Sequence, residues 1–406
     1  MKYTLKAICT KIGSGATPTG GKEAYKGGDY ALVRSQNVLD YTFTTSGLAY
    51  INETQAKKLD GVKVEVGDVL LNITGDSVAR ACIIPDEILP ARVNQHVAII
   101  RANNQYALNE YLLYFLQYNK QYLLSISQGG GTRSAITKKM IEDIEIDLPS
   151  LEDQLSIVNI INSISKKIEV NQQINDNLEQ QAQVLYKSWF VDFEPFKDGE
   201  FVESEMGEIP VGWTVVKFSD LTEIPKKTIN PQKFPDTIFK QYSLPACDNG
   251  LIPENQTGKD IMSNKIILQN NTTLFSKLNP RIKRIWFTCE VQPNSICSTE
   301  FIPYRATNEN ESGYIFSIIN SEAFYASVMG CVNGATGSHQ RFHAEDTEDF
   351  LCAYNKDVVK KFSQHINAVL KQMHDLRQEN VKLALMRDTL LPKLMSGELK
   401  INEIDC

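Results

Sequence analysis

The stretch LEDQLSIVNIINSISKKIEVNQQINDNLEQQAQVLYKSWFVDFEPF, residues 151–196, decides how this chain is organised. Its apolar residues recur at spacings of three and four, which predicts one long helix with a single apolar face. Pro149 precedes the helix, and neither Pro nor Gly interrupts it before Pro195 and Gly199. From Leu151 to Trp189 the helix would be about 57 Å long, which is too long for burial inside one domain. The apolar positions are Ile157, Ile161, Ile164, Ile168, Ile174, Leu178 and Leu185.

A second long helix is predicted near the other end of the sequence, over residues 356–400. Its apolar residues follow a nearly strict heptad, Asn380 occupies one seam position, and Gly397 ends the pattern. Two helices of similar length in one chain predict an intramolecular coiled coil, and we favour antiparallel pairing. The apolar positions of this helix are Phe362, Ile366, Val369, Met373, Leu376, Leu383, Leu390 and Leu394.

Two asparagines, Asn171 and Asn175, lie near the apolar seam of the first helix. One of them could face Asn380 and fix the register of the coiled coil, as buried asparagines do in other coiled coils. Alternatively, these side chains lie at the solvent-exposed edge of the seam. The sequence leaves both alternatives open.

The composition is typical of a globular protein with two or more domains, since 42% of the 406 residues are hydrophobic and 22% are charged. No apolar run is long enough to cross a bilayer, and the opening MKYTLKAICTK does not resemble a leader, so we expect a cytoplasmic location. The 8 cysteines lack CxxC spacing, which favours reduced thiols. His339 and His343 are spaced as a metal pair but lack the acid of HExxH, so no metal site is expected.

The net charge of −7 does not by itself exclude nucleic acid as a partner. The acidic excess is concentrated in residues 151–209, which contain 4 Lys and Arg against 12 Asp and Glu. Outside that segment the chain is close to neutral, and a neutral domain can still carry a basic face.

Residues 1–150 are predicted to form a mixed α/β domain. Strands are expected at Tyr30–Val33, Val69–Ile73 and Val97–Ile100, and a helix from Asn109 to about Ser127. The inner side of that helix is expected to carry Leu112, Leu113, Phe115, Leu116 and Leu123. Glycine-rich loops occur at Gly13–Gly21, Asn72–Arg80 and Ser127–Ser134. None has the spacing of a phosphate loop. For each single loop an ordinary turn is a better explanation than close approach to a phosphate chain.

The second half of the chain repeats the first. The segment GWTVVKF resembles MKYTLKA, SEAFYASVM (Ser321–Met329) predicts a helix, and NGATGSHQR (Asn333–Arg341) corresponds in placement to GGGTRSA (Gly129–Ala135). The repeat distance is about 200 residues, which indicates a duplicated domain followed by a helix.

The predicted fold class is therefore α+β. Two similar mixed α/β domains, residues 1–150 and 210–355, are separated by two long helices, residues 151–196 and 356–400, that form the antiparallel coiled coil. A charged linker, residues 197–209, and a short tail, residues 401–406, complete the chain.

Over nearly its whole length the chain resembles the specificity subunits of type I restriction–modification systems. Besides the order of domains and helices, three stretches carry the resemblance. They are GTRSAITKKMIEDIEIDLPSLEDQLSIV (Gly131–Val158), KSWFVDFEPF (Lys187–Phe196) and LLPKLMSGEL (Leu390–Leu399). The second half departs from the pattern, because Pro149–Gln154 has no good copy there and Glu223–Phe234 replaces a glycine-rich loop.

The resemblance implies that each α/β domain is a target recognition domain for one half of a split double-stranded DNA sequence. It also implies that the helices set the spacer and dock two modification (methyltransferase) subunits, which bind S-adenosylmethionine and methylate adenine. Restriction subunits join to cleave unmodified DNA. The specificity subunit is then non-catalytic and needs no cofactor of its own.

Base recognition requires Arg, Lys, Gln or Asn side chains in loops, because these make bidentate contacts to guanine and adenine edges. The strongest candidates are Arg34 and the cluster SKLNPRIKR (Ser276–Arg284). In the first domain the candidates are Arg34, Gln36, Asn37, Arg80, Arg92, Asn94, Gln95 and Arg133. In the second they are Lys226, Lys227, Lys240, Gln241, Tyr242, Lys277, Arg281, Lys283, Arg284, Arg305, Gln340 and Arg341. For each of them a solvated surface side chain is the alternative.

Trp189 and Phe190 could dock a methyltransferase subunit or pack between helix and domain. Two competing classes remain, namely an enzyme that carries its own recognition halves and a coiled-coil adaptor that does not bind DNA. The enzyme is disfavoured because Asn230–Pro231 and Asn279–Pro280 lack the second proline and the aromatic residue of an adenine methyltransferase loop.

Overall fold

The computed structural model describes residues 2–20, 24–25, 27–128, 134–332 and 340–399. The chain divides into two compact units, one comprising residues 1–166 and 383–406 and the other residues 167–382. We call them unit 1 and unit 2. Each contains one α/β head and a segment of both long helices, which differs from the predicted separation of heads and helices. The reason is that each helix segment buries its apolar face in the core of a head.

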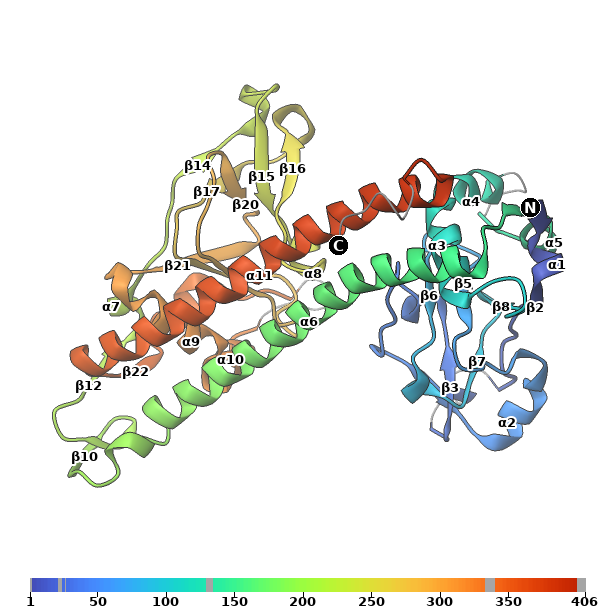
Figure 1. Cartoon of the computed structure of the whole chain (residues 1–406). Coiled ribbons are helices and arrows are strands. Elements are labelled where there is room, and N and C mark those ends of the chain that lie inside the picture. The colour runs from blue at the N-terminus through green and yellow to red at the C-terminus, as the bar shows by residue number, and fades with distance from the viewer. Residues whose placement is uncertain (1, 21–23, 26, 129–133, 333–339, 400–406) are drawn as a thin grey trace. The chain divides into compact units, whose positions relative to one another are not determined.

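Both predicted long helices are present (Figure 1). Helix α6 spans Leu151–Phe190 and helix α11 spans Lys356–Ser396, with 40 and 41 residues. Helix α11 ends as predicted, because Gly397 follows it with a φ of +74°. Helix α6 ends earlier than Phe196, since Phe193 adopts a φ of +50° and begins a 3-10 turn.

The head of unit 1 contains a four-stranded antiparallel sheet, a three-stranded sheet and a small pair of strands. The order of the first sheet is β2-β8-β5-β6, formed by Cys9–Ser14, Val97–Ala102, Val69–Asn72 and Ala81–Ile83. The order of the second is β4-β3-β7, formed by Ala49–Ile51, Tyr30–Val33 and Ala91–Val93, with β3 parallel to β7. Strand β1 (Lys2–Thr4) pairs with β9 (Glu145–Asp147), directly before α6.

Five short helices complete this head: α1 (Leu5–Ile8), α2 (Glu53–Lys58), α3 (Asn109–Tyr118), α4 (Lys120–Ser127) and α5 (Lys138–Glu142). The single helix predicted from Asn109 to Ser127 is thus two helices. The break lies at Asn119, whose Nδ2 donates to the carbonyl of Phe115 at 2.9 Å. An asparagine that bonds to nearby backbone favours a helix end over a helix interior. The five predicted inner residues are all buried.

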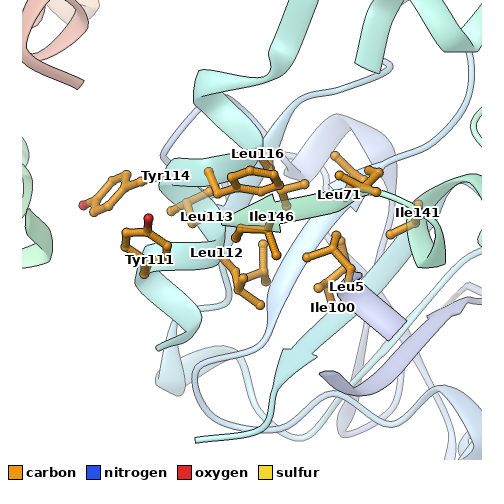
Figure 2. Packing of buried hydrophobic residues seen from close by; sticks show 14 of the residues in the cluster. Leu5, Leu71, Ile100, Tyr111, Leu112, Leu113, Tyr114, Leu116, Ile141 and Ile146 are labelled. Carbon is orange, nitrogen blue, oxygen red and sulfur yellow. The ribbon is translucent and has the colours of Figure 1, made fainter. Parts of the chain in front are cut away.

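Strand β5 explains why this head has two apolar layers. All four of its residues are buried, and its alternation places Leu71 against α3 and Leu70 against β3 and β7. Figure 2 shows Leu71 and Ile100 close to Leu112 and Ile146 in the first of these layers. In unit 1 the same layer includes Ile157, Val158 and Ile161 of α6 and Leu391 and Leu394 of α11.

Unit 2 repeats this topology, so the predicted duplication is confirmed. Its four-stranded sheet has the order β13-β21-β18-β19, and β12 pairs with β22 directly before α11. Strand β15 is parallel to β20 and antiparallel to β16. In the same way, β3 of unit 1 is parallel to β7 and antiparallel to β4. The bounds of these strands are β13 (Thr222–Glu223), β21 (Phe301–Ala306), β18 (Thr272–Ser276), β19 (Ile285–Thr288), β12 (Thr214–Lys217), β22 (Leu351–Tyr354), β15 (Ile238–Tyr242), β20 (Ser295–Cys297) and β16 (Glu254–Thr257).

Two additional strands and several helices distinguish the head of unit 2. Strands β14 (Thr228–Ile229) and β17 (Lys265–Ile267) extend its second sheet to five strands, where unit 1 has three. Its helices are α7 (Phe218–Leu221), α8 (Leu244–Asp248), α9 (Ser312–Asn320) and α10 (Glu322–Gly330), of which α10 confirms the helix predicted around Ser321–Met329.

The segment 197–209, predicted as a linker, forms a β-hairpin in unit 2. Strand β10 (Phe201–Ser204) pairs antiparallel with β11 (Gly207–Pro210). Ile209 is buried in the same apolar core as Trp213. The charged residues that suggested a linker lie on exposed positions of the hairpin, so composition alone hid its two strands.

The helices pair antiparallel within unit 2, as predicted. Asn171, which is fully buried, donates through Nδ2 to Oδ1 of Asn380 at 2.8 Å, and Asn380 donates to the carbonyl of Ile168 at 3.2 Å. Further along α6, the ring of Phe190 packs against Phe362, near the start of α11, with ring centroids 4.9 Å apart. The facing-asparagine alternative is therefore confirmed for Asn171.

Candidate nucleic-acid interface

Four connections meet at one end of the head of unit 1. The amide of Asn94 donates to the carbonyl of Val33, and the amide of Ile73 donates to the carbonyl of His96, both at 3.0 Å. Gly15 donates to the carbonyl of Asn94 at 3.1 Å. A Cβ on Gly15 would lie 1.8 Å from the carbonyl oxygen of Val93, so only glycine permits this approach. We call residues 14–17, 34–38, 72–80 and 94–96 the loop end of unit 1.

Asn72 holds two of these connections together, and it was not among the residues predicted from the sequence to be functional. Its side chain is fully buried at the end of β5, and Nδ2 donates to the carbonyls of Ser35 at 2.9 Å and Val38 at 3.2 Å. An asparagine at the end of an otherwise apolar strand was the available signal, because a buried amide requires partners.

Arg34 and Gln36 lie at this loop end, and both hydrogen-bond to the chain nearby. The guanidinium of Arg34 donates to the carbonyl of Gly47, as does Nε2 of the exposed Gln36 at 3.1 Å. Asn37 corrects the prediction: it is fully buried, and Nδ2 donates to the carbonyls of Thr44 and Ser46 at 3.0 and 3.2 Å. Asn37 shapes the loop and has no surface to offer a base.

Arg92 and Asn94 are further corrections. Arg92 is only 4% exposed, donates to the carbonyl of Ala56 at 3.1 Å and to Asp60 at 3.0 Å, and lies over the ring of Tyr30. Asn94 is 7% exposed, and its Oδ1 accepts from the amide of His96. Both side chains stabilise the framework, because buried polar groups must find partners inside the protein.

A chain of side-chain hydrogen bonds crosses the loop end of unit 1. The hydroxyl of Thr17 donates to Oε1 of the exposed Gln95, and Nε2 of Gln95 lies 3.0 Å from Nε2 of His96. Nδ1 of His96 lies 2.6 Å from Oγ1 of Thr74. The chain connects the segments after β2, β5 and β7, and sequence reasoning missed His96 and Thr74. Arg80 is half-buried at this end, and Arg133 lies outside the described residues.

Unit 2 has the corresponding loop end. The amide of Ser298 donates to the carbonyl of Tyr242 at 3.0 Å, and the amide of Lys277 donates to the carbonyl of Glu300 at 2.9 Å. The amide of Asn279 donates to the carbonyl of Gln340 at 2.8 Å. We call residues 242–248, 277–284, 298–300 and 340–341 the loop end of unit 2.

Several candidate cations of unit 2 are held in ion pairs. Arg284 binds Asp248 through two hydrogen bonds of 2.6 and 2.8 Å, which raise the pKa of the guanidinium. Arg341 binds Glu300 through two bonds of 3.2 and 3.1 Å. Arg305 pairs with Glu223 and Glu309 toward the other end of β21. Because its side chain is 14% exposed and doubly paired, Arg305 is a poor candidate for a base contact.

Tyr242 is a correction, since it is 5% exposed and its ring packs against Trp286 at 4.6 Å. Lys283 donates to the carbonyl of Asn320 at 2.6 Å and lies over the ring of Tyr325, and burial lowers its pKa. The exposed or half-buried candidates that remain in this unit are Lys226, Lys227, Lys240, Gln241, Lys277, Arg281 and Gln340.

Phe190 lies in the core of unit 2 and is 3% exposed. Its ring packs against Tyr314 at 4.6 Å and Trp213 at 5.5 Å. Trp189 is half-buried and packs against Phe362 and Phe196. This geometry supports packing between helix and head rather than docking of a partner on Phe190.

The described cysteines are free thiols, and burial raises the pKa of Cys82 and of Cys297 to about 12. Within the described ranges, no group of three or more His, Cys, Asp or Glu side chains could hold a metal ion. His339, one member of the histidine pair, lies outside those ranges. No helix in the part of the chain that the structure describes is long and apolar enough to cross a membrane.

Two copies of one α/β head, each combined with segments of two antiparallel helices, define a two-headed coiled-coil class of protein. Residues 1–180 match the family model described as the type I restriction modification DNA specificity domain. The type I restriction enzyme MjaIX specificity subunit of Methanocaldococcus jannaschii is 24% identical, over 97% of this chain and 92% of its own. The HindI specificity subunit of Haemophilus influenzae is 22% identical, over 91% of this chain and 94% of its own.

Among solved structures, the S subunit of a type I restriction–modification system from M. genitalium has a similar fold. Its TM-score is 0.53 at 12% identity, and the match covers 97% of this chain and 95% of that one. Over nearly its whole length the chain is therefore similar to specificity subunits of type I restriction enzymes.

Proposed function

We propose that this specificity subunit binds a bipartite double-stranded DNA target and reads one half of it with each head. The observation that supports the proposal is the duplication itself. The two heads share strand order and the same connections at their loop ends, but the side chains at these ends differ. A repeated framework suits two similar stretches of duplex, and different side chains suit two different sequences.

We further propose that the chain holds two methyltransferase subunits, with which restriction subunits associate. In this arrangement S-adenosylmethionine binds the methyltransferase subunits, where adenine is methylated, and this chain contributes recognition. The family relationship supports this division of labour, since the relatives are specificity subunits of restriction enzymes.

Exposed cations of unit 2 are suited to phosphate contacts. Arg281 is exposed at the loop end, Lys226 and Lys227 are exposed on the segment between β13 and β14, and the acidic excess of the chain lies in residues 151–209. Each phosphate neutralised by Lys or Arg releases counterions, so binding by the assembled complex should weaken as salt rises. If the complex shows no salt-dependent binding to duplex DNA, the adaptor alternative is favoured.

The decisive experiment maps adenine methylation in the genome of the source cell, with and without this gene. A split motif with an unread spacer should disappear when the gene is deleted and return when it is restored. If no motif changes while the cognate methyltransferase subunit is expressed, the proposal fails.

A further inference from the structure

The turns between β7 and β8 and between β20 and β21 occupy the same place in the two heads. Residues 94–96 connect β7 to β8, and residues 298–300 connect β20 to β21. The carbonyl of His96 accepts from Ile73 directly after β5, and the carbonyl of Glu300 accepts from Lys277 directly after β18. His96 and Glu300 are therefore equivalent positions with different chemistry.

In unit 1, this position orients the amide of Gln95. The hydroxyl of Thr17 bonds to Oε1 of Gln95, which places Nε2 toward His96 at 3.0 Å. An amide nitrogen only donates, so Nε2 of His96 accepts and the ring proton lies on Nδ1. Nδ1 then donates to Thr74 at 2.6 Å. Thr17 and His96 thus hold the two ends of the Gln95 amide and fix its plane.

The oriented Gln95 retains the groups that recognise adenine. Its amide has two N–H groups and two oxygen lone pairs, and one of each is used by His96 and Thr17. The remaining N–H and lone pair can bond N7 and the N6 amine of adenine together. Gln95 is exposed at the loop end, so a base edge can reach it. Because the amide is already held, little side-chain entropy is lost on binding.

In unit 2, the equivalent Glu300 orients a different side chain, Arg341. The two bonds from Nε and Nη2 of Arg341 fix the plane of its guanidinium. Arg341 forms a β-bridge with Leu278, just as Ala135 does with Thr74 in unit 1. A guanidinium has five N–H donors, so three remain after Glu300 is bound. Its side chain is 42% exposed, and a free guanidinium edge fits O6 and N7 of guanine.

We propose that Gln95 specifies an adenine in the first half-site and Arg341 a guanine in the second, with His96 and Glu300 as their positioning residues. This inference rests on the proposed function, because it assumes that each head reads one half of the target. It goes further by assigning a base to one position in each half. Thus the same turn, built twice, gives the two heads different preferences.

The test for Gln95 uses the full complex with its methyltransferase subunits, and genome-wide methylation as the readout. Gln95→Ala should relax one position of the first half-motif that requires A in the wild type, with a roughly 5- to 150-fold loss of discrimination there. Gln95→Glu should shift that position toward C, because a carboxylate accepts from the cytosine amine. His96→Phe should relax the same position and no other. Gln105→Ala, an exposed glutamine beyond the other end of β8, is the matched control.

The test for Arg341 separates charge from geometry. Arg341→Lys keeps the charge but removes the planar fork, so one G position of the second half-motif should relax while the salt dependence of binding stays the same. Glu300→Gln should relax that same position. Arg305→Lys makes the same substitution in an acid-paired arginine away from the loop end, and it should leave the motif intact.

Failure of this inference differs from failure of the proposed function. If a split motif depends on the gene but the Gln95 and Arg341 variants leave every position as specific as before, the assignment of these two readers is overturned. The same holds if the positions that relax require other bases than A and G. If no split motif depends on the gene at all, the proposed function fails instead.

Discussion

Arginine and asparagine side chains that look alike in the sequence have opposite roles in the structure. Arg92 and Asn37 are buried and hydrogen-bonded to backbone, whereas Gln95 and Arg281 are exposed at loop ends. The difference follows from neighbours that are distant in sequence, such as Ala56 and Asp60 around Arg92. A polar residue in a loop is therefore a candidate for DNA contact only when it is exposed and some of its hydrogen-bonding groups remain free.

Arg92 provides a test of this distinction. Arg92→Met should lower the stability of the chain by about 1–3 kcal/mol, because the carbonyl of Ala56 loses a buried donor. The methylation motif should not change, since Arg92 has almost no exposed surface. Thermal melting together with a methylation map checks both parts. A relaxed motif at unchanged melting temperature would restore Arg92 as a base reader.

His374 on α11 predicts a pH dependence within unit 2. Burial lowers its pKa from the ordinary 6.5, although the neighbouring Asp375 and Glu290 oppose the shift. The unfolded chain therefore binds a proton at higher pH than the folded chain, and stability falls as pH decreases through about 6.5. Above that pH both states are neutral and the effect vanishes. His374→Gln should flatten the melting temperature between about pH 7.5 and about pH 5.5 relative to wild type. An equal fall in both proteins would assign the effect elsewhere.

At the scale of elements, the two long helices show how a polar pair can occupy an apolar seam. The predicted seam positions Leu178 and Leu185 are only half-buried, whereas Asn171, Ala182 and Tyr186 are buried. A seam assigned from large apolar residues alone leaves out the polar Asn171 and the small Ala182. The predicted seam is therefore displaced around α6 from the face that is buried. The antiparallel direction and the end of α11 at Gly397 were nevertheless predicted correctly.

The asparagine pair leads to a prediction about register. Asn380→Leu should lower the stability of unit 2 by about 1–3 kcal/mol, because the fully buried Asn171 loses a partner. The double variant with Asn171→Leu should recover stability, since both seam positions are then apolar. Urea unfolding of the four proteins of this cycle gives the coupling between the two residues. Unchanged stability and register in Asn380→Leu would show that the pair does not set the register.

At the scale of the molecule, the duplication gives two heads of the same topology, and under the proposed function each would recognise one half of the target. Every strand pairing of the first head has a counterpart in the second, and strands β14 and β17 are additions within one sheet. The loop ends are built from connections within each head, so their side chains can vary without altering the other head.

Exchange of one head tests this independence. Replacing residues 214–354 by the corresponding head of another specificity subunit should change the second half of the methylation motif and leave the first half intact. The β12–β22 pair closes this segment and provides the junction. Methylation mapping of the hybrid, with the unaltered chain as control, is the measurement. Simultaneous change of both halves would contradict separate recognition by the two heads.

The sequence by itself determined the two long helices, three strands of the first head (β3, β5 and β8) and the duplication. These features depend on local periodicity, on glycine and proline at helix ends, and on repeated order along the chain. The predictions that were wrong also have local causes. Asn119 divides one predicted helix into two, and the charged residues of segment 197–209 hid the β10–β11 hairpin.

Only the tertiary structure decided which polar side chains belong to the framework and which remain free at the loop ends. Asn72, Arg92, His96 and Arg341 each have a partner between 22 and 41 residues away in the sequence, so no local pattern reveals these contacts. A buried polar group must be satisfied wherever the fold brings a partner, and an exposed one is available to a ligand. That placement is a property of packing, and it is what separates structural residues from candidate readers of DNA in this chain.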